Sequence, residues 1–439
     1  MDRFKDEILQ LVKKYADAYH IRKPFTEGDR INYSGRVYDS AEIVNLVDSA
    51  LEFWLTSGRF TEEFEQKLAS YIGVKYCSFV NSGSSANLLA FMALTSYLLE
   101  ERAIFPGDEV ITVAAGFPTT VSPIVQYGAI PVFVDITIPQ YNIDVTALES
   151  ALSKKTKAVM LAHTLGNPFD IAAITAFCEK YNLWLIEDNC DALGSEYTLN
   201  GKKAKTGTFG DIGTSSFYPP HHITTGEGGA VYTDNPMLAK IIRSMRDWGR
   251  DCECASGQDN LCGFRFDKQF GELPHGYDHK YVYSHLGYNL KATDMQAAIG
   301  IAQLEKIDAF TKARRNNFNL LKDALLPVSD KLILPEACPQ SDPSWFGFLI
   351  TCKDGVNRNI LIKELENHNI QTRLLFAGNI VRQPCFTNMH ENEKKYRIIN
   401  SLNNTDIVMN DTFWVGVYPG MNENAVDYMA HAIKNIIDK

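Results

Sequence analysis

The feature that most constrains the fold is an alternation of short, apolar, β-rich segments with stretches of helical periodicity over most of the chain. Helical patterns at 86–98, 145–153 and 171–181 fall between the strand-like segments. Such alternation predicts an α/β fold with a mainly parallel central sheet and helices on both faces, whose ligands bind at the carboxyl ends of the strands. The predicted strands are residues 77–80, 109–113, 130–134, 158–162, 183–187, 212–217 and 230–233.

A change in the pattern of predicted helices and strands near residue 310 predicts a second domain. A long helix is expected at 293–311, and the segments after it contain fewer strands. A chain of 439 residues is long enough for two domains with separate cores. We therefore expect a large domain over 1–310, which includes an N-terminal amphipathic helix and a loop near 252–262, and a smaller α+β domain over 311–439.

Charge and hydropathy exclude several functional classes. The formal net charge is −10, from 43 Lys+Arg against 53 Asp+Glu, so no basic surface is expected for nucleic acid. The uncharged stretch 110–134 contains three prolines, which break it into strand, helix and strand, so no membrane span is predicted. The N-terminus lacks the apolar core of a secretion signal, and we predict a cytoplasmic protein.

The segment NSGSSAN, residues 81–87, follows one predicted strand and precedes an apolar helix. Free backbone amides and the positive end of a helix dipole at this place can bind a phosphate, with Ser84 and Ser85 nearby. Serine and glycine also form ordinary helix N-caps. Both interpretations stay open for this motif alone.

Two further segments carry candidate chemistry. The strand LWLI ends in acidic residues that include Asp188, where an α/β enzyme can hold a cofactor nitrogen or a metal and where a solvated turn is the alternative. The segment SSFYPPHHITTGEGGAV places His221 and His222 between a proline turn and a glycine-rich run. A histidine pair of this kind alone is usually a surface turn or a packed pair.

The cysteines divide into two groups. The chain has nine, an odd number, and a cytoplasmic location argues against a disulfide framework. Most stand singly in apolar or mixed surroundings, where a thiol behaves as a small hydrophobic group. Cys252, Cys254 and Cys262 instead lie within eleven residues of polar, loop-like sequence. That cluster requires a separate explanation.

Taken together, these segments resemble the fold type I, pyridoxal-phosphate-dependent sugar aminotransferases and dehydrases of the DegT type. The likeness covers most of the chain, from GRFTEEFEQKLASYIGVKYC through NSGSSANLLA, AAGFPTT, IEDNCDALG, SFYPPHHITTGEGGAV and GYNLKATDMQAAIG to WVGVYPG. The resemblance implies the fold type I aminotransferase-like architecture. It also implies a binding site for pyridoxal or pyridoxamine phosphate.

The resemblance assigns residues to the cofactor phosphate. It implies that Ser84, Ser85 and Ser216 hold this phosphate beside Gly83. Asn289 would reach the phosphate of a second subunit across an interface. The expected assembly is therefore a homodimer.

The resemblance also assigns residues to the cofactor ring. Phe117 would stack on the ring, and Asp191 would lie beside the ring hydroxyl. Asp188 would pair with the ring nitrogen, which is physically reasonable because a carboxylate keeps that nitrogen protonated and the ring electron-withdrawing.

One departure from the family's aminotransferases predicts the reaction. Their lysine, which binds the cofactor covalently, is replaced here by His221, and no lysine occurs between Lys205 and Lys240. An imidazole cannot form that bond, but it can move protons near neutral pH. We therefore expect non-covalently held pyridoxamine phosphate and dehydration of a keto sugar rather than amino transfer.

The cysteines select one branch of the family. Cys190, Cys252, Cys254 and Cys262 resemble the 2Fe-2S ligands of its iron-sulfur sugar 3-dehydrases, and thiolates suit such a cluster. The resemblance implies CDP-4-keto-6-deoxy-D-glucose as substrate, 3,6-dideoxyhexose biosynthesis as the pathway, and an NADH-dependent flavin and iron-sulfur reductase as partner.

Alternatives stay open. The four cysteines could hold a structural zinc. The chain could be a metal-free deoxygenase that uses glutamate, or a non-catalytic regulator that senses redox state. Arg373, Phe376 and Tyr218 could line a sugar pocket or serve packing equally well, and His222 has no assigned role.

Overall fold

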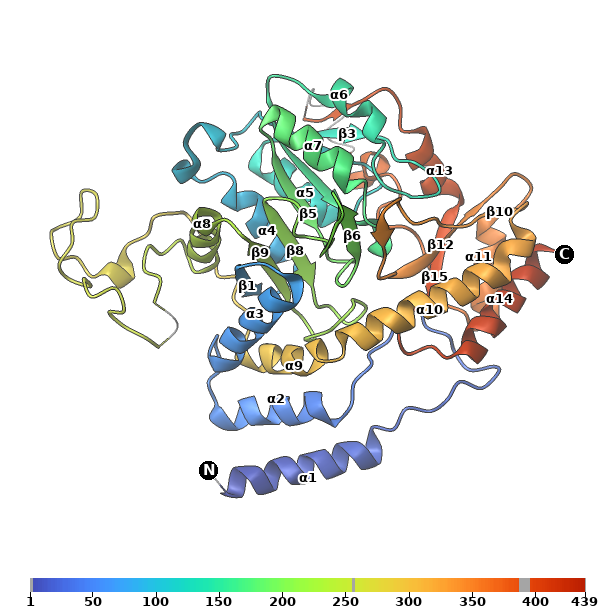
Figure 1. Ribbon diagram of the computed structural model, residues 1–439, viewed down its shortest axis with the longest axis horizontal. Helices are drawn as coiled ribbons and strands as arrows, with labels where there is room; N and C mark the ends of the chain where they lie inside the picture. The colour runs from blue at the N-terminus through green and yellow to red at the C-terminus, as the bar shows by residue number, and fades with distance from the viewer. Residues whose placement is uncertain (1–2, 255–256, 387–394, 439) are drawn as a thin grey trace.

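The computed structural model describes residues 3–254, 257–386 and 395–438, and its centre is an eight-stranded sheet (Figure 1). The strand order is β1-β9-β8-β5-β4-β2-β3-β14. The bounds are β1 Tyr76–Val80, β2 Glu109–Val113, β3 Ile130–Val134, β4 Thr156–Ala162, β5 Trp184–Asp188, β8 Ile212–Ser216, β9 Gly229–Thr233 and β14 Arg397–Ile398.

The sheet is mainly parallel, as predicted. Every neighbouring pair from β8 to β14 is parallel, and only β9 runs against its two neighbours, β1 and β8. The seven predicted strands differ from the observed ones by at most two residues at either end. The α/β fold class is confirmed.

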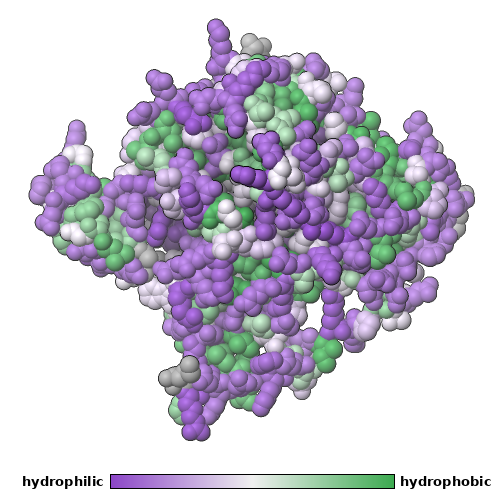
Figure 2. Space-filling model, in the orientation of Figure 1, coloured by the Kyte–Doolittle hydropathy of each residue, from purple (hydrophilic) through white to green (hydrophobic). Residues whose placement is uncertain are grey.

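Successive residues of the central strands enter two different cores. Val159 and Leu185 pack on one face of the sheet with α7, whereas Met160 and Ile186 pack on the other face with α4 and α8. This arrangement buries both faces, which explains why the strands read as continuous apolar runs. The surface in Figure 2 is accordingly mostly hydrophilic. The covering helices are α4 Gly83–Ala93, α5 Pro118–Tyr127, α6 Leu148–Ala151, α7 Ile171–Tyr181 and α8 Pro236–Arg246.

A second, four-stranded sheet has the order β10-β12-β15-β13 and packs with helices from the C-terminal third of the chain. Its strands are β10 Leu332–Ile333, β12 Gly347–Cys352, β13 Thr372–Arg373 and β15 Thr412–Gly416. A three-stranded sheet joins β6 Glu196–Leu199, β7 Lys202–Lys205 and β11 Ser341–Asp342. The domain boundary near 310 stays a prediction. The remaining helices are α1 Arg3–Tyr19, α2 Ser40–Glu52, α3 Arg59–Ile72, α9 Asp294–Leu304, α10 Ile307–Leu325, α11 Arg358–Asn367, α13 Asn403–Asp411 and α14 Glu423–Ile437.

The prediction of a single helix over 293–311 is wrong. The helix is interrupted between α9 and α10. Lys306, at this interruption, forms an ion pair through Nζ with Glu42 Oε1 at 2.6 Å. Helix α9 packs on α2 and α3, whereas α10 packs on α14 of the second sheet's layer. One straight helix could not meet both sets of partners, so tertiary packing overrides the continuous helical pattern.

The stretch 110–134 forms β2, α5 and β3, as the prolines predicted. Across residues 3–254, 257–386 and 395–438, no helix combines the length and hydropathy that a bilayer crossing requires. The cytoplasmic location stays a prediction.

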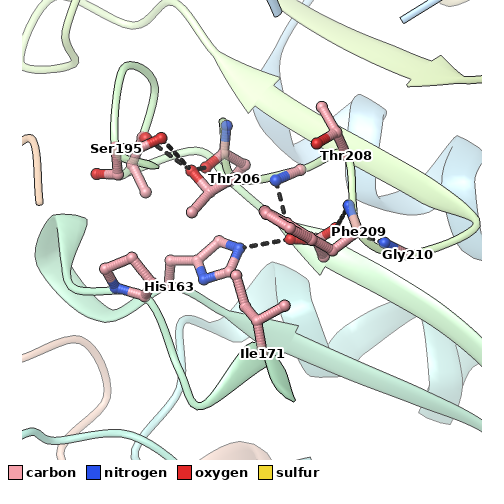
Figure 3. Close-up of polar contacts among 12 residues, drawn as sticks. His163, Ile171, Ser195, Thr206, Thr208, Phe209 and Gly210 are labelled. Atoms are coloured by element: carbon pink, nitrogen blue, oxygen red, sulfur yellow. Dashed lines mark hydrogen bonds and ion pairs between the residues drawn. The ribbon is translucent and has the colours of Figure 1, made fainter. Parts of the chain in front are cut away.

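A buried carboxylate at the end of β5 anchors the loop that leads into β8. Glu187 Oε1 accepts hydrogen bonds from the amides of Phe209 and Gly210, at 2.7 and 2.6 Å. Its Oε2 accepts from Gly207 N and contacts His163 Nε2 at 3.0 Å. Figure 3 shows His163 and the loop amides converging from opposite sides. The loop position therefore depends on one side chain.

Glu187→Ala is expected to lower the free energy of unfolding by roughly 3–5 kcal/mol, because it leaves three loop amides and one imidazole without their acceptor. Urea denaturation followed by circular dichroism measures the change. Glu179→Ala, at an exposed position of α7, is the control and should stay within about 0.5 kcal/mol of wild type. Equal stability of the two variants would contradict the anchoring role.

Candidate active site

A cavity of about 430 Å³ opens at the carboxyl ends of β5 and β8, where ligands of parallel sheets bind. Its other wall comes from the second sheet, through Arg373 on β13 and Trp414 on β15. Of the predicted site residues, the cavity is lined by Gly83, Ser84, Phe117, Asp188, Cys190, Asp191, Ser216 and His221.

The N-terminus of α4 forms the phosphate-binding candidate. Ser82 caps this eleven-residue helix by accepting a hydrogen bond from Ser85 N at 3.0 Å, and Gly83 and Ser84 face the cavity. A side chain at Gly83 would collide with Ser216, so glycine allows the helix end to meet β8. Ser85 is not among the lining residues, and its Oγ accepts from Ser82 Oγ instead. The helix end has the geometry and dipole that favour an anion.

Asp188 is a buried carboxylate, 4% exposed, that is fixed by neighbouring elements. Its Oδ2 accepts hydrogen bonds from Asn87 Nδ2 and Thr120 Oγ1, each at 2.7 Å. Its Oδ1 accepts from the amide of Cys190 at 3.2 Å. Sequence reasoning missed Asn87 and Thr120. For Asn87 a signal existed, because it lies one helical turn after Gly83 on the same face of α4.

Phe117 stands at the N-cap of α5 and is 47% exposed at the cavity. Its ring meets that of Phe376 edge to face, with centroids 6.0 Å apart. An aromatic surface is therefore available beside Asp188 for stacking on a planar ligand.

His221 lies in the proline turn after β8 and lines the same cavity. Its Nδ1 is 3.3 Å from Asp191 Oδ1, close enough for an ion pair when the imidazole is protonated. Within the described chain this buried Nδ1 makes no hydrogen bond of good geometry. The imidazole is thus positioned beside a carboxylate and can exchange a proton with a ligand.

His222 is not among the residues that line the cavity, and it holds the turn in place. It is buried, and its Nε2 bonds to the Ser344 carbonyl at 2.7 Å. Burial first, and then the charge of Arg314, hold the pKa of His222 well below its usual value. Arg314 is itself buried and donates to the His221 carbonyl at 3.3 Å, and burial lowers the pKa of its guanidinium to about 9. These two residues fix the backbone that carries His221.

The sugar-pocket candidates Arg373, Phe376 and Tyr218 all line the cavity. The guanidinium of Arg373 lies 4.1 Å from the centroid of the Tyr33 ring. Tyr33 also lines the cavity, and the sequence analysis did not identify it. Among the described residues that line the cavity, Arg373 therefore provides a cation beside aromatic rings.

Asn289 and the loop cysteines lie elsewhere. Asn289 does not line the cavity, and its Oδ1 accepts from Lys291 Nζ at 2.7 Å. Cys252, Cys254 and Cys262 belong to the segment between α8 and α9, whereas Cys190 lines the cavity, where burial raises the pKa of its thiol well above the usual value. Among the described residues, no group of three or more potential metal ligands is arranged to hold a metal ion.

This chain is similar in sequence to known proteins over nearly its whole length. The sequence profile of the DegT/DnrJ/EryC1/StrS aminotransferase family matches residues 37–434. Lipopolysaccharide biosynthesis protein RfbH of Salmonella typhimurium is 56% identical, with 98% of this chain and 97% of that protein aligned. A dTDP-4-dehydro-2,6-dideoxy-D-glucose 3-dehydratase of Saccharopolyspora spinosa is 49% identical, with 99% and 92% aligned.

A solved structure extends the likeness. The E. coli GDP-4-keto-6-deoxy-D-mannose-3-dehydratase with bound hydrated PLP superposes with a TM-score of 0.80 and 29% sequence identity. The match covers 92% of this chain and 100% of that one. Over 92% of its length the chain thus has the fold of this dehydratase.

The depressed pKa of His222 predicts a pH dependence of stability. Because the unfolded imidazole binds a proton more readily than the folded one, wild-type stability should fall as the pH drops below about 6.5, by up to about 1.4 kcal/mol per pH unit. His222→Gln keeps a donor for Ser344 and should flatten this decline. Denaturation at pH 5, 6 and 7 measures it, and parallel pH profiles of the two proteins would contradict the prediction.

Proposed function

This chain belongs to the DegT/DnrJ/EryC1/StrS aminotransferase family, and we propose that within it the chain is a sugar-nucleotide 3-dehydratase that holds pyridoxamine phosphate without a covalent bond. The observation that carries this proposal is His221 at the wall of the cavity that Asp188 also lines. No lysine is among the residues that line this cavity in the described part of the chain. A covalent anchor is thus replaced by an acid–base group.

The residues at the cavity fit the proposed cofactor. Gly83 and Ser84 at the end of α4, with Ser216 opposite, would hold its phosphate. Phe117 would cover the ring and Asp188 would hold the ring nitrogen. When bound, pyridoxamine phosphate supplies an amine for the substrate ketone and an electron-withdrawing ring.

His221 would act as the general base and acid of the reaction. Its imidazole would take up a proton from the bound reactants and return one, and Asp191 Oδ1, 3.3 Å from Nδ1, would orient the ring. His222 and Arg314 hold the turn so that the imidazole stays aimed at the cavity. Loss of a hydroxyl from carbon 3 is the outcome, and this is the reaction that the names of the relatives from Saccharopolyspora spinosa and E. coli state.

His221→Asn is expected to reduce dehydration by roughly 10²–10⁴-fold, the contribution typical of a positioned acid–base group. Mass spectrometry of a nucleotide-linked 4-keto-6-deoxy sugar incubated with the loaded enzyme measures loss of water. Equilibrium dialysis should show unchanged binding of pyridoxamine phosphate. His431→Asn, at an exposed position of α14, is the control. Retained turnover in His221→Asn would refute the assignment of the base.

The finer part of the proposal concerns substrate and electron transfer. By the resemblance of its motifs, the substrate is CDP-4-keto-6-deoxy-D-glucose, and a 2Fe-2S cluster on Cys190, Cys252, Cys254 and Cys262 accepts electrons from an NADH-dependent reductase. Four thiolates are the ligands that such a cluster requires. Among the described residues of one copy, no group of three or more potential ligands is arranged to hold a metal ion.

Cys254→Ser is expected to abolish the iron-sulfur absorption and the reductive step while dehydration continues. Visible spectra with iron and sulfide assays measure the cluster, and Cys385→Ser, at an exposed cysteine, is the matched control. Stoichiometric zinc without iron in wild-type protein would contradict the cluster and support the structural alternative. Turnover with glutamate alone, without a reductase, would identify a metal-free deoxygenase.

A further inference from the structure

The proposed cluster ligands are divided between two separate parts of the chain. Cys252, Cys254 and Cys262 lie on the segment between α8 and α9, for which we use the name cysteine arm, residues 250–254 and 257–286. Cys190 follows β5 and lines the active-site cavity. A cluster site therefore requires the arm to approach a copy of Cys190.

The base of the arm is closed by backbone contacts. Arg250 and Tyr283 form an antiparallel bridge, and Asp251 N donates to the Val282 carbonyl at 2.9 Å. Gly249 has a φ of +84°, and a side chain there would collide with the His285 carbonyl. The two ends of the arm thus leave the body together at one narrow point.

The arm also has its own internal scaffold. His279 Nε2 contacts Asp251 Oδ2 at 2.7 Å, and its Nδ1 lies 3.5 Å from Cys262 Sγ. The imidazole stacks on Phe264 and Phe270, with centroids 5.4 and 4.6 Å away. These contacts hold Cys262 by residues of the arm itself. Cys262 is therefore positioned within the arm, while Glu253 and His285 connect the base of the arm to α8 through Lys240 and Ser244.

The arm extends away from the cavity of its own chain. Figure 1 shows it projecting beyond α8, on the side of the large sheet opposite to the second sheet. The cavity is lined by residues of that second sheet, so it lies toward the other side. This arrangement disagrees with a four-cysteine site built within one copy, and among the described residues no such site is formed.

The surface of the arm is suited to contact with protein. Figure 2 shows hydrophobic residues exposed on the arm, at the left of the view. Five of its large apolar or aromatic side chains are more than half exposed, and their burial against another protein surface would be favourable. They are Leu261 67%, Phe266 55%, Tyr281 56%, Tyr283 53% and Leu286 98%.

We propose that each 2Fe-2S site is completed between two copies of this chain, with Cys252, Cys254 and Cys262 from the arm of one copy and Cys190 from the cavity of the other. A second copy supplies the missing thiol and a surface for the exposed side chains. In a two-fold dimer the exchange is reciprocal, so two identical sites form and neither arm is left unpartnered. The inference rests on the proposed function, which calls for the cluster.

A mixed dimer tests the exchange directly. Cys190→Ser and Cys254→Ser chains carry different affinity tags, are co-expressed, and are purified through both tags so that only the mixed dimer remains. If sites form between copies, one site of the mixed dimer has all four cysteines, and iron and labile sulfide should be half of the wild-type content. If sites form within one copy, both are broken, and the absence of iron would overturn the proposal.

A second mixed dimer is the matched control. Pairing Cys254→Ser with Cys262→Ser breaks an arm in both copies, so no iron is expected with either arrangement. Size-exclusion chromatography shows whether each preparation is a folded dimer. Iron at half content in both mixed dimers would overturn the proposal, because it would show that the arm cysteines are dispensable.

Disulfide trapping keeps the test independent of the cluster. Metal-free wild-type protein is treated with copper phenanthroline, in which two Cu(II) ions are reduced to Cu(I) by the two electrons released when two thiols lose their protons and form one disulfide. A covalent dimer on a non-reducing gel, lost in Cys190→Ser, supports the exchange. A disulfide from Cys190 to an arm cysteine of the same chain, or none to Cys190, overturns it. If the protein never binds iron but still forms the covalent dimer, the cluster is refuted, whereas the contact between Cys190 and the arm of the other copy is supported.

Discussion

The buried carboxylate of Asp188 is the constraint on which the site depends. Asp188 is only 4% exposed, and burying a carboxylate costs free energy unless hydrogen bonds replace those to water. Here Asn87 from α4 and Thr120 from α5 provide that compensation, and both donate to the same oxygen. The end of β5 and the starts of two helices must therefore come together, which also places Gly83 and Phe117 at the cavity.

A second group of contacts fixes His221, the proposed acid–base residue. The turn at 219–222 has no regular structure of its own, so its position depends on what it packs against. Arg314 reaches the His221 carbonyl from α10, and His222 bonds to the Ser344 carbonyl. Both anchors come from sequence after residue 310. The segment that carries His221 is thus held by the part of the chain that forms the other wall of the cavity.

Much of this fold could be predicted because its signals are local. The strands β2 and β3 match their predicted bounds, since an apolar run between turn residues identifies a buried strand without knowledge of its neighbours. The break between α9 and α10 could not be predicted in this way. The pattern there is continuously helical, and the chain bends because α2 and α14 lie in different layers. Asn87 was missed for a similar reason, because its role depends on an acid 101 residues away.

The sequence by itself determined the chemical groups available: a histidine pair in a stretch without lysine, an acid at the end of a buried strand, and three cysteines within eleven residues. Only the tertiary structure decided which of these groups meet. It brought Asp188, His221 and Asp191 to one cavity, and it left Asn289 and the cysteine arm outside it. The physical reason is that residue type and local periodicity are properties of neighbouring positions, whereas convergence depends on packing between segments that are distant in the chain.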